Sequence, residues 1–255
     1  MSTRLALPEG ELSLLGRITT ASNATFVGTI DGVRVVYKPV AGEQPLWDFP
    51  GATLATREVA TYLVSEALGW DVVPPTWVRE GPHGPGMVQL WREPDPDQEA
   101  VTVVAARAVP DGLLHVIDGL GAGGEPVSLV HEDSIALRRV AVLDVLVNNA
   151  DRKGGHVLEM PGGHRHGCDH GLTFHTEPKL RTVLWGWVGE PLLAEEITAV
   201  RRVRELVDGP LGRALASLVA EDEVTALAER CVALADTGVF PAPTGDMPAV
   251  PWPPF

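Results

Sequence analysis

The stretch LDVLVNNADRKGGH, residues 143–156, decides the fold and the site predicted for this chain. Asp151 is followed two residues later by Lys153 and five residues later by His156, and a second acid, Asp169, stands further on before a His-Gly pair. Phosphoryl transfer needs an acid facing the acceptor, a cation on the γ-phosphate and ligands for a divalent metal. The spacing therefore predicts a kinase-type site, with Asp151 and Lys153 as catalytic residues and Asp169 and His156 as metal ligands.

The last ligand of this loop bears on which ions the site accepts. Asn is usual at the position of His156, and a nitrogen ligand suits Mn²⁺ or another transition metal better than Mg²⁺. The expected cofactors are accordingly ATP and either Mg²⁺ or Mn²⁺. The simpler alternative is that DRKGGH forms a polar surface turn after a helix.

The composition argues against several classes of partner. The 255 residues are 45% hydrophobic, enough to bury a core in one large domain or two small lobes. The formal net charge of −14 argues against a nucleic-acid partner and against electrostatic docking on an anionic membrane. No apolar run approaches the roughly twenty residues of a membrane span, so no integral membrane segment is expected. Two cysteines and an N-terminus without signal-peptide features favour a cytoplasmic protein.

The first ninety residues carry the pattern of an antiparallel sheet with one helix. Asp31-Gly32 separates two alternating runs, and the second run ends in Lys38. Apolar residues then recur at helical spacing over residues 53–68, a segment that carries Glu58 and is followed by Gly69. Kinase folds pair a phosphate-contacting Lys with a helical Glu in this arrangement. The strands are expected at residues 12–18, 25–30, 33–38, 71–78 and 86–91.

The turn between the first two strands, residues 20–24, is small and polar. Its backbone N–H groups, including those of Ser22 and Asn23, are expected to cover the phosphates of ATP as a glycine-rich loop does. A plain hairpin turn is the alternative for this segment taken alone. Ser22 and Asn23 join Lys38 and Glu58 as predicted cofactor-binding residues.

A break rich in Pro and acids at residues 91–97 predicts a hinge, beside which adenine is expected to bind. A mostly helical second lobe should follow, with Ser134 as the N-cap of a buried helix that delivers Asp151 to the site. Residues 156–160 and 165–169 predict a short hairpin that brings His156 and Asp169 together. The predicted fold is thus α+β and bilobal, with an N-lobe at 1–92, a C-lobe at 93–239 and a Pro-rich arm at 240–255.

Five segments of the chain, in this order, resemble a known group of kinases: VVYKP at 35–39, REVATYLVSEALG at 57–69, GMVQLW at 86–91, LDVLVNNADRKGGH at 143–156 and CDHGLTF at 168–174. The group is the phosphatidylinositol 3- and 4-kinase superfamily, most closely the type II phosphatidylinositol 4-kinases and their uncharacterised bacterial relatives. The resemblance implies a protein-kinase-like fold in which Lys38 holds ATP phosphates and Gln89, Leu90 and Trp91 form the adenine hinge. It also implies that Asn149 orients the catalytic loop.

The chain departs from that group at His156 and in lacking the cysteine-rich lipidation segment and any basic membrane patch. A soluble small molecule or a protein is therefore expected as the phosphoryl acceptor, which stays unidentified, in preference to a membrane lipid. Two alternatives remain open. One is a catalytically silent nucleotide-binding pseudokinase, and the other is a metal-dependent hydrolase built from the clustered histidines His156, His164, His166, His170 and His175.

Overall fold

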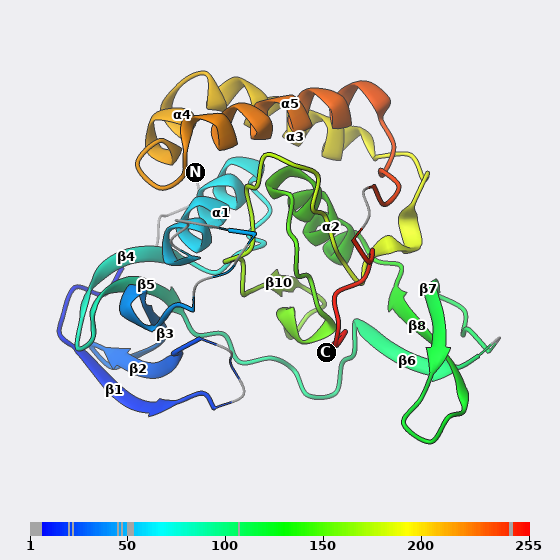
Figure 1. Ribbon diagram of the computed structural model, residues 1–255, viewed down its shortest axis with the longest axis horizontal. Helices are drawn as coiled ribbons and strands as arrows, with labels where there is room; N and C mark the ends of the chain where they lie inside the picture. Colours follow the sequence, from blue (N-terminus) through cyan, green and yellow to red (C-terminus); the bar gives the residue numbers. More distant parts are fainter. Residues whose placement is uncertain are drawn as a thin grey trace.

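The computed structural model describes residues 7–19, 21, 23–44, 46, 48–49, 54–106, 108–244 and 247–255. The chain is an α+β structure in which a five-stranded antiparallel sheet lies on one side and helices on the other (Figure 1). The first part comprises β1 (Leu12–Arg17), β2 (Phe26–Ile30), β3 (Val33–Pro39), the 3₁₀ helix η1 (Val40–Gly42), α1 (Leu54–Leu68), β4 (Thr76–Gly81) and β5 (Gly84–Leu90). The second comprises β6 (Val101–Ala105), β7 (Leu113–Leu120), β8 (Pro126–Glu132), α2 (Ile135–Val147), η2 (Gly154–His156), β9 (Val157–Glu159), β10 (Arg165–Gly167), η3 (Trp185–Trp187), α3 (Ala194–Val207), α4 (Pro210–Leu215) and α5 (Glu221–Thr237).

The first sheet has the strand order β1-β2-β3-β5-β4, and each neighbouring pair is antiparallel. β2 and β3 meet at the predicted turn, where Asp31 and Gly32 have positive φ angles of 51° and 78°. Such a two-residue turn matches the right-handed twist of the flanking strands. The predicted antiparallel N-lobe sheet is confirmed. It buries a core of its own, formed by Leu12, Ile30, Val35, Tyr37, Val88 and Leu90.

The strand predicted at residues 71–78 begins later, at Thr76. Pro74 and Pro75 have no N–H to donate to a neighbouring strand, which keeps this segment out of the sheet. Residues 71–73 instead run beside β10, where the N–H of Gly167 donates to the carbonyl of Val72 (2.8 Å). The connection after α1 is thereby bonded to the strand that leads to Asp169.

α1 links the sheet to the helical part of the molecule. The helix contacts β4 and β5, while its buried Val64 and Leu68 pack in the main core with Leu143 and Leu146 of α2. Apolar contacts on both sides fix the orientation of the helix because each rotation would expose buried surface to water. Glu58 therefore projects from a helix that is held in place.

α2 begins and ends as the sequence predicts for a buried helix that delivers a loop. The hydroxyl of Ser134 accepts a hydrogen bond from the N–H of Leu137 (3.1 Å), which satisfies one of the free donors at the helix start. The helix ends at Asn148, which adopts the left-handed conformation (φ 53°). The side-chain amide of Asn148 donates to the carbonyls of His175 (2.8 Å) and Glu177 (2.7 Å). These bonds fix the chain direction at the start of the 149–156 loop.

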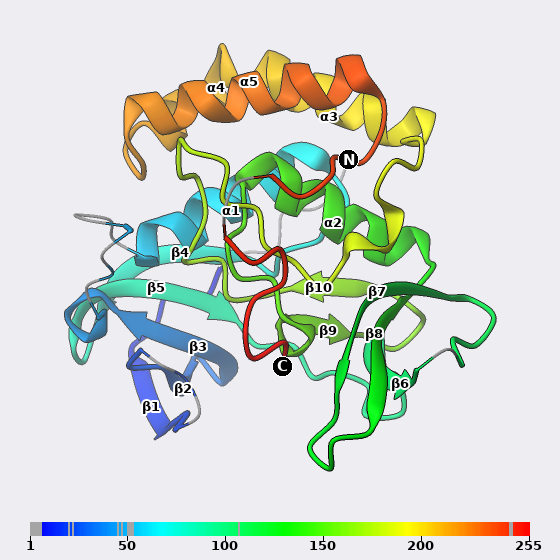
Figure 2. The ribbon, with the colours of Figure 1, turned by 45° about the vertical axis from the view of Figure 1, so that its right-hand side comes forward.

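A second sheet, of three antiparallel strands in the order β6-β8-β7, lies near the start of the predicted C-lobe (93–239). It projects beside β9 and β10 (Figure 2). The sequence pattern does not predict this sheet, since it indicates a mostly helical lobe after the hinge. Helices do prevail beyond Ser134, where α2, α3 and α5 carry much of the main core.

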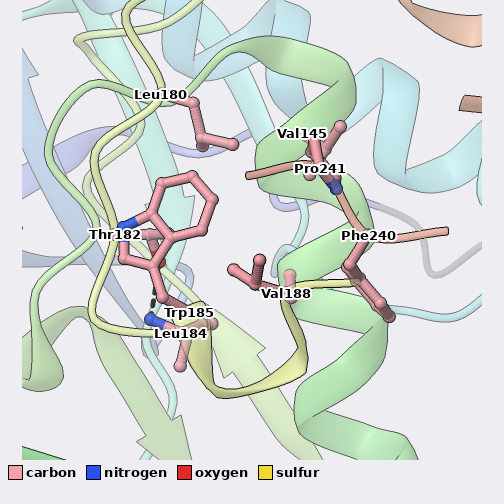
Figure 3. A pocket seen from close by; sticks show the side chains of 9 residues that line it. Val145, Leu180, Thr182, Leu184, Trp185, Val188, Phe240 and Pro241 are labelled. Carbon is pink, nitrogen blue, oxygen red and sulfur yellow. Dashed lines mark hydrogen bonds between the residues drawn. The ribbon is translucent and has the colours of Figure 1, made fainter. Parts of the chain in front are cut away.

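The Pro-rich arm at 240–255 packs along the helical part. Phe240 and Pro241 lie near Val145 of α2 and Trp185, and together with neighbouring residues they line a small apolar cavity (Figure 3). Further along the arm, the carbonyl of Ala249 accepts hydrogen bonds from the N–H of Thr182 (3.0 Å) and the indole N–H of Trp185 (2.8 Å). This part of the arm therefore runs beside residues 182–185.

Candidate active site

Lys38 lies at the centre of a cluster built from three distant parts of the chain. Its ammonium nitrogen is 2.6 Å from Oε1 of Glu58 on α1 and 2.7 Å from Oδ1 of Asp169. Burial alone would lower the pKa of Lys38, but the carboxylates of Asp169 and Glu58 raise it above its ordinary value. Lys38 is therefore a fixed cation on β3, and the structure brings together the three residues that the sequence assigned to phosphates and metal.

Glu58 also organises the backbone next to Asp169. The glutamate side chain is 2% exposed, and its second oxygen accepts a hydrogen bond from the N–H of His170 (2.9 Å). Buried carboxylates are stable only when paired and hydrogen-bonded, and both conditions hold here. One carboxylate thus sets the position of Lys38 and of the chain that carries Asp169.

Asp169 adopts a backbone conformation that most residues avoid. Its φ is 57°, in the left-handed region, which Asp tolerates better than most residues do. The side chain is 52% exposed, and the ammonium of Lys38 lowers the pKa of the Asp169 carboxyl. Asp169 is therefore an anionic group presented to solvent, as a metal ligand requires.

His156 presents one ring nitrogen toward Asp169. Its Nδ1 contacts the carbonyl of Asp151 (2.9 Å), which can only accept, so Nδ1 carries the proton. Burial lowers the pKa of His156, which keeps the ring neutral near pH 7. The free Nε2 is then an electron-pair donor 3.5 Å from Oδ2 of Asp169. A carbonyl that fixes the tautomer of a histidine in this way is typical of metal-ligating histidines.

Replacing His156 with Asn is expected to shift metal preference from Mn²⁺ toward Mg²⁺ while ATP still binds, because an amide oxygen replaces the imidazole nitrogen. Calorimetric titration of ATP in Mg²⁺ and in Mn²⁺ measures this preference as a ratio of affinities. His115→Asn, on the exposed β7, is the matched control. An unchanged ratio in His156→Asn would leave this residue a structural role only.

Asp151 lies in the loop after α2 with Lys153 beside it. The side-chain oxygen of Asn149 accepts from the N–H of Asp151 (3.0 Å), and Nζ of Lys153 is 3.8 Å from Oδ2 of Asp151. Burial, followed by the charge of Asp169, raises the pKa of Asp151 to about 6, although the ammonium of Lys153 opposes the shift. A carboxylate with this pKa can take a proton from an acceptor hydroxyl near neutral pH.

An NMR titration of the Asp side-chain carboxyls should show one group with a midpoint near 6, and this signal should be missing from Asp151→Asn. A general base must be ionised, so turnover that depends on Asp151 should rise as pH increases through this midpoint. Asp95 is the internal reference, because a hydrogen bond from Gln98 lowers its pKa. A normal Asp titration for Asp151 would remove the basis for this pH dependence.

Arg152, next to Asp151, is fully buried, and its guanidinium forms hydrogen bonds to groups within the protein. Its Nε and Nη2 donate to the two carboxylate oxygens of Asp144 on α2, both at 2.8 Å. Its Nη1 donates to the carbonyls of His156 (2.9 Å) and Cys168 (3.1 Å). Arg152 therefore ties together the two segments that carry His156 and Asp169.

A cleft of about 180 Å³ opens over this cluster. Lys38, Glu58, Asp151 and Asp169 line it on one side, and Asn23 lines it from the turn between β1 and β2. Glu43 lies in the same cleft, where its carboxylate accepts from the N–H groups of Leu54 (2.9 Å) and Ala55 (2.8 Å) at the start of α1. No local pattern in the sequence points to Glu43 as a helix cap, because it stands eleven residues before the helix.

The predicted hinge residues do not line this cleft. Gln89 is buried in the sheet, where its side-chain amide donates to the hydroxyl of Thr76 (2.9 Å), and Leu90 packs in the core of the sheet. The indole N–H of Trp91 donates to Glu93 (2.9 Å). Their role toward adenine stays a prediction that would involve the backbone of this segment. Ser22, the other residue of the predicted phosphate turn, lies outside the described residues.

The five clustered histidines do not form one metal centre. Nε2 of the buried His170 accepts from Arg152 (2.6 Å), and the ring of His175 meets that of Phe49 edge-on. His156 faces Asp169, whereas His164 and His166 lie together at β10. The five histidines thus lie at separate places in the structure and do not converge on one point.

Within the described ranges, no helix is both long enough and apolar enough to cross a bilayer.

These observations define the chain as a two-lobed α+β protein with a Lys-Glu-Asp cluster in the cleft beside its catalytic-type loop. No family model matches the sequence. Protein Rv2133c of Mycobacterium tuberculosis is 48% identical over 262 residues, which cover 98% of this chain and 94% of that protein. The chain belongs to the family of Protein Rv2133c.

Two solved structures share a remote likeness with the chain. The proinflammatory kinase CtkA of Helicobacter pylori is 10% identical with a TM-score of 0.44, and the match covers 91% of this chain and 94% of that one. A chain from the HipA, HipB and operator DNA complex of Shewanella oneidensis MR-1 is 12% identical with a TM-score of 0.45, over 92% of this chain and 75% of that one.

Proposed function

We propose that this protein is an ATP- and divalent-metal-dependent phosphotransferase. The observation that carries the proposal is the simultaneous pairing of Lys38 with Glu58 (2.6 Å) and Asp169 (2.7 Å). Phosphoryl transfer relies on a lysine that is paired with a glutamate on a helix and on a metal-binding acid. Lys38 would hold the phosphates of ATP. Glu58 would position Lys38, and the turn containing Asn23 would cover the phosphates.

The donor set at Asp169 fits a divalent metal. An anionic carboxylate and the free Nε2 of a neutral imidazole, His156, are 3.5 Å apart, and the fixed tautomer of His156 leaves that nitrogen able to bind. A bound Mg²⁺ or Mn²⁺ would supply charge neutralisation for the transferred phosphoryl group. Asp151 would accept the proton of the acceptor hydroxyl, and Lys153 would stabilise the phosphoryl oxygens beside it.

The finer assignment to the phosphatidylinositol 3- and 4-kinase superfamily rests on the five sequence segments. The acceptor we propose is a soluble small molecule or a protein, because the formal charge of −14 disfavours docking on an anionic membrane. We further propose that the protein acts in the cytoplasm.

Formation of ADP from ATP tests the proposal and separates it from silent nucleotide binding. The purified protein is incubated with ATP and Mg²⁺ or Mn²⁺, alone and with soluble polyols, sugars, proteins or phosphoinositide vesicles. We expect metal-dependent ADP formation that Asp151→Asn lowers by roughly 10²–10⁴-fold, since general base catalysis contributes that much. ATP binding without ADP formation under all of these conditions would instead indicate a pseudokinase.

A further inference from the structure

A second cluster of ligand-type side chains lies outside the candidate active site. Asp71, His164 and His166 each offer one ligand atom, and these atoms lie within 4.8 Å of one another; no other such group occurs among the residues that the structure describes. Asp71 belongs to the connection between α1 and β4, whereas the histidines stand just before and within β10. Two segments far apart in the sequence therefore converge on one point.

Both imidazole rings are held in the way that metal-binding histidines are held. Nε2 of His164 lies 2.8 Å from the carbonyl of Asp71, and Nδ1 of His166 lies 3.3 Å from the carbonyl of Val72. Because a carbonyl only accepts, these nitrogens carry the protons, and Nδ1 of His164 and Nε2 of His166 keep their lone pairs. Backbone carbonyls that fix the tautomer are the usual outer contacts of metal-ligating histidines.

The donor atoms of the group favour a transition-metal cation. His166 is buried, and the carboxylate of Asp71 brings one negative charge to the group. Arg92 also acts on His166 as a nearby positive charge, and a bound ion would have to tolerate it. Two imidazoles and one carboxylate suit Zn²⁺ and other transition metals better than Mg²⁺.

We propose that Asp71, His164 and His166 form a transition-metal site, which takes Zn²⁺ with water completing the coordination. This site is separate from the metal site proposed at Asp169 and does not depend on the proposed kinase activity. Asp71 stands three residues after the end of α1, and His166 stands three residues before Asp169. A bound ion therefore ties the end of the helix that carries Glu58 to the strand that leads to Asp169.

Asp71 offers a clean variant because its own backbone is unusual. Its φ is 54°, in the left-handed region, where Asn is tolerated as well as Asp. Asp71→Asn removes the charge and leaves the backbone conformation accessible. Asp31→Asn makes the same change at another left-handed, exposed position (φ 51°) in the β2–β3 turn and serves as the matched control. His164→Ala, with His115→Ala on β7 as its control, is the second variant, which avoids the buried His166.

Calorimetric titration of chelator-treated protein with ZnCl₂, in excess Mg²⁺ and without nucleotide, tests the site. We expect one Zn²⁺ equivalent whose affinity falls roughly tenfold or more in Asp71→Asn and His164→Ala, while both control variants bind as the wild type does. Zn²⁺ should also raise the melting temperature of the wild type and of Asp169→Asn, but not of His164→Ala.

Three results would overturn the proposal. One is no Zn²⁺ binding at micromolar concentrations, and another is wild-type Zn²⁺ affinity in both Asp71→Asn and His164→Ala. The third is a Zn²⁺ equivalent that disappears in Asp169→Asn alone, which would place the ion at the candidate active site. Because none of these readouts involves ATP, the proposed kinase activity stands or falls separately.

Discussion

Replacing Asp169 with Asn is expected to weaken metal-dependent ATP binding at least roughly a hundredfold and to remove its dependence on Mg²⁺ or Mn²⁺. The change removes a carboxylate that lies 2.7 Å from Lys38 and 3.5 Å from His156, and it leaves the shape of the side chain intact. Asn also tolerates the left-handed φ of 57° at this position, so the backbone need not move. Calorimetric titration of ATP with metal and with chelator measures the effect.

Asp31→Asn is the control for this prediction. Both residues are aspartates with left-handed φ, but Asp31 lies in the exposed turn between β2 and β3 and outside the cleft. Its substitution should leave ATP affinity within about twofold of the wild type. Equal ATP affinity in Asp169→Asn and wild type, each measured with metal, would show that Asp169 holds no metal for the nucleotide.

Arg152→Met is expected to lower the free energy of unfolding by about 3–5 kcal/mol, the largest stability effect predicted for this chain. The methionine fills most of the volume, but it leaves the carboxylate of Asp144 buried without its cation. The carbonyls of His156 and Cys168 each lose the hydrogen bond from Arg152 as well. Urea denaturation followed by circular dichroism measures the change.

Two further variants test whether the loss of stability in Arg152→Met comes from the buried, unpaired charge of Asp144 or from the loss of any ion pair. Arg204→Met breaks an i,i+4 ion pair between Arg204 on α3 and Asp208 at the C-cap of that helix, at the protein surface. This change should lower the free energy of unfolding by about 0.5 kcal/mol or less. The double variant Arg152→Met with Asp144→Asn should be more stable than Arg152→Met alone, because it no longer buries an unpaired charge. If the double variant is less stable than the single one, the buried charge of Asp144 is not the reason for the loss.

Local patterns predicted the elements that carry the site. The Asp31-Gly32 turn fixed the β2–β3 hairpin and hence the place of Lys38, and the Ser134 cap fixed the start of α2. The hairpin predicted from residues 156–160 and 165–169 is present as β9 and β10, with Gly167 opposite Val157. These features depend on contacts between residues close in the sequence, which is why a pattern could reveal them.

What the sequence did not reveal depends on long-range contacts. Several outward positions of the β6-β8-β7 sheet are apolar, among them Val103, Ile117 and Leu120, so its strands lack the alternation of apolar and polar residues that predicts a half-buried sheet. The fixed tautomer of His156 and the cap that Glu43 places on α1 are visible only in three dimensions. The same holds for the meeting of Asp71 with His164 and His166, since no spacing rule links the α1–β4 connection to β10.

The central feature of the proposed function is an ATP site that needs a divalent metal. Calorimetric titration of the purified wild-type protein with ATP, in Mg²⁺, in Mn²⁺ and in chelator, tests this in one experiment. We expect saturable ATP binding in at least one of the two metals and a loss of that binding in chelator, because the phosphates of ATP would contact Lys38 and a metal ion bound by Asp169. No ATP binding in any of the three solutions, or equal affinity with and without metal, would contradict it.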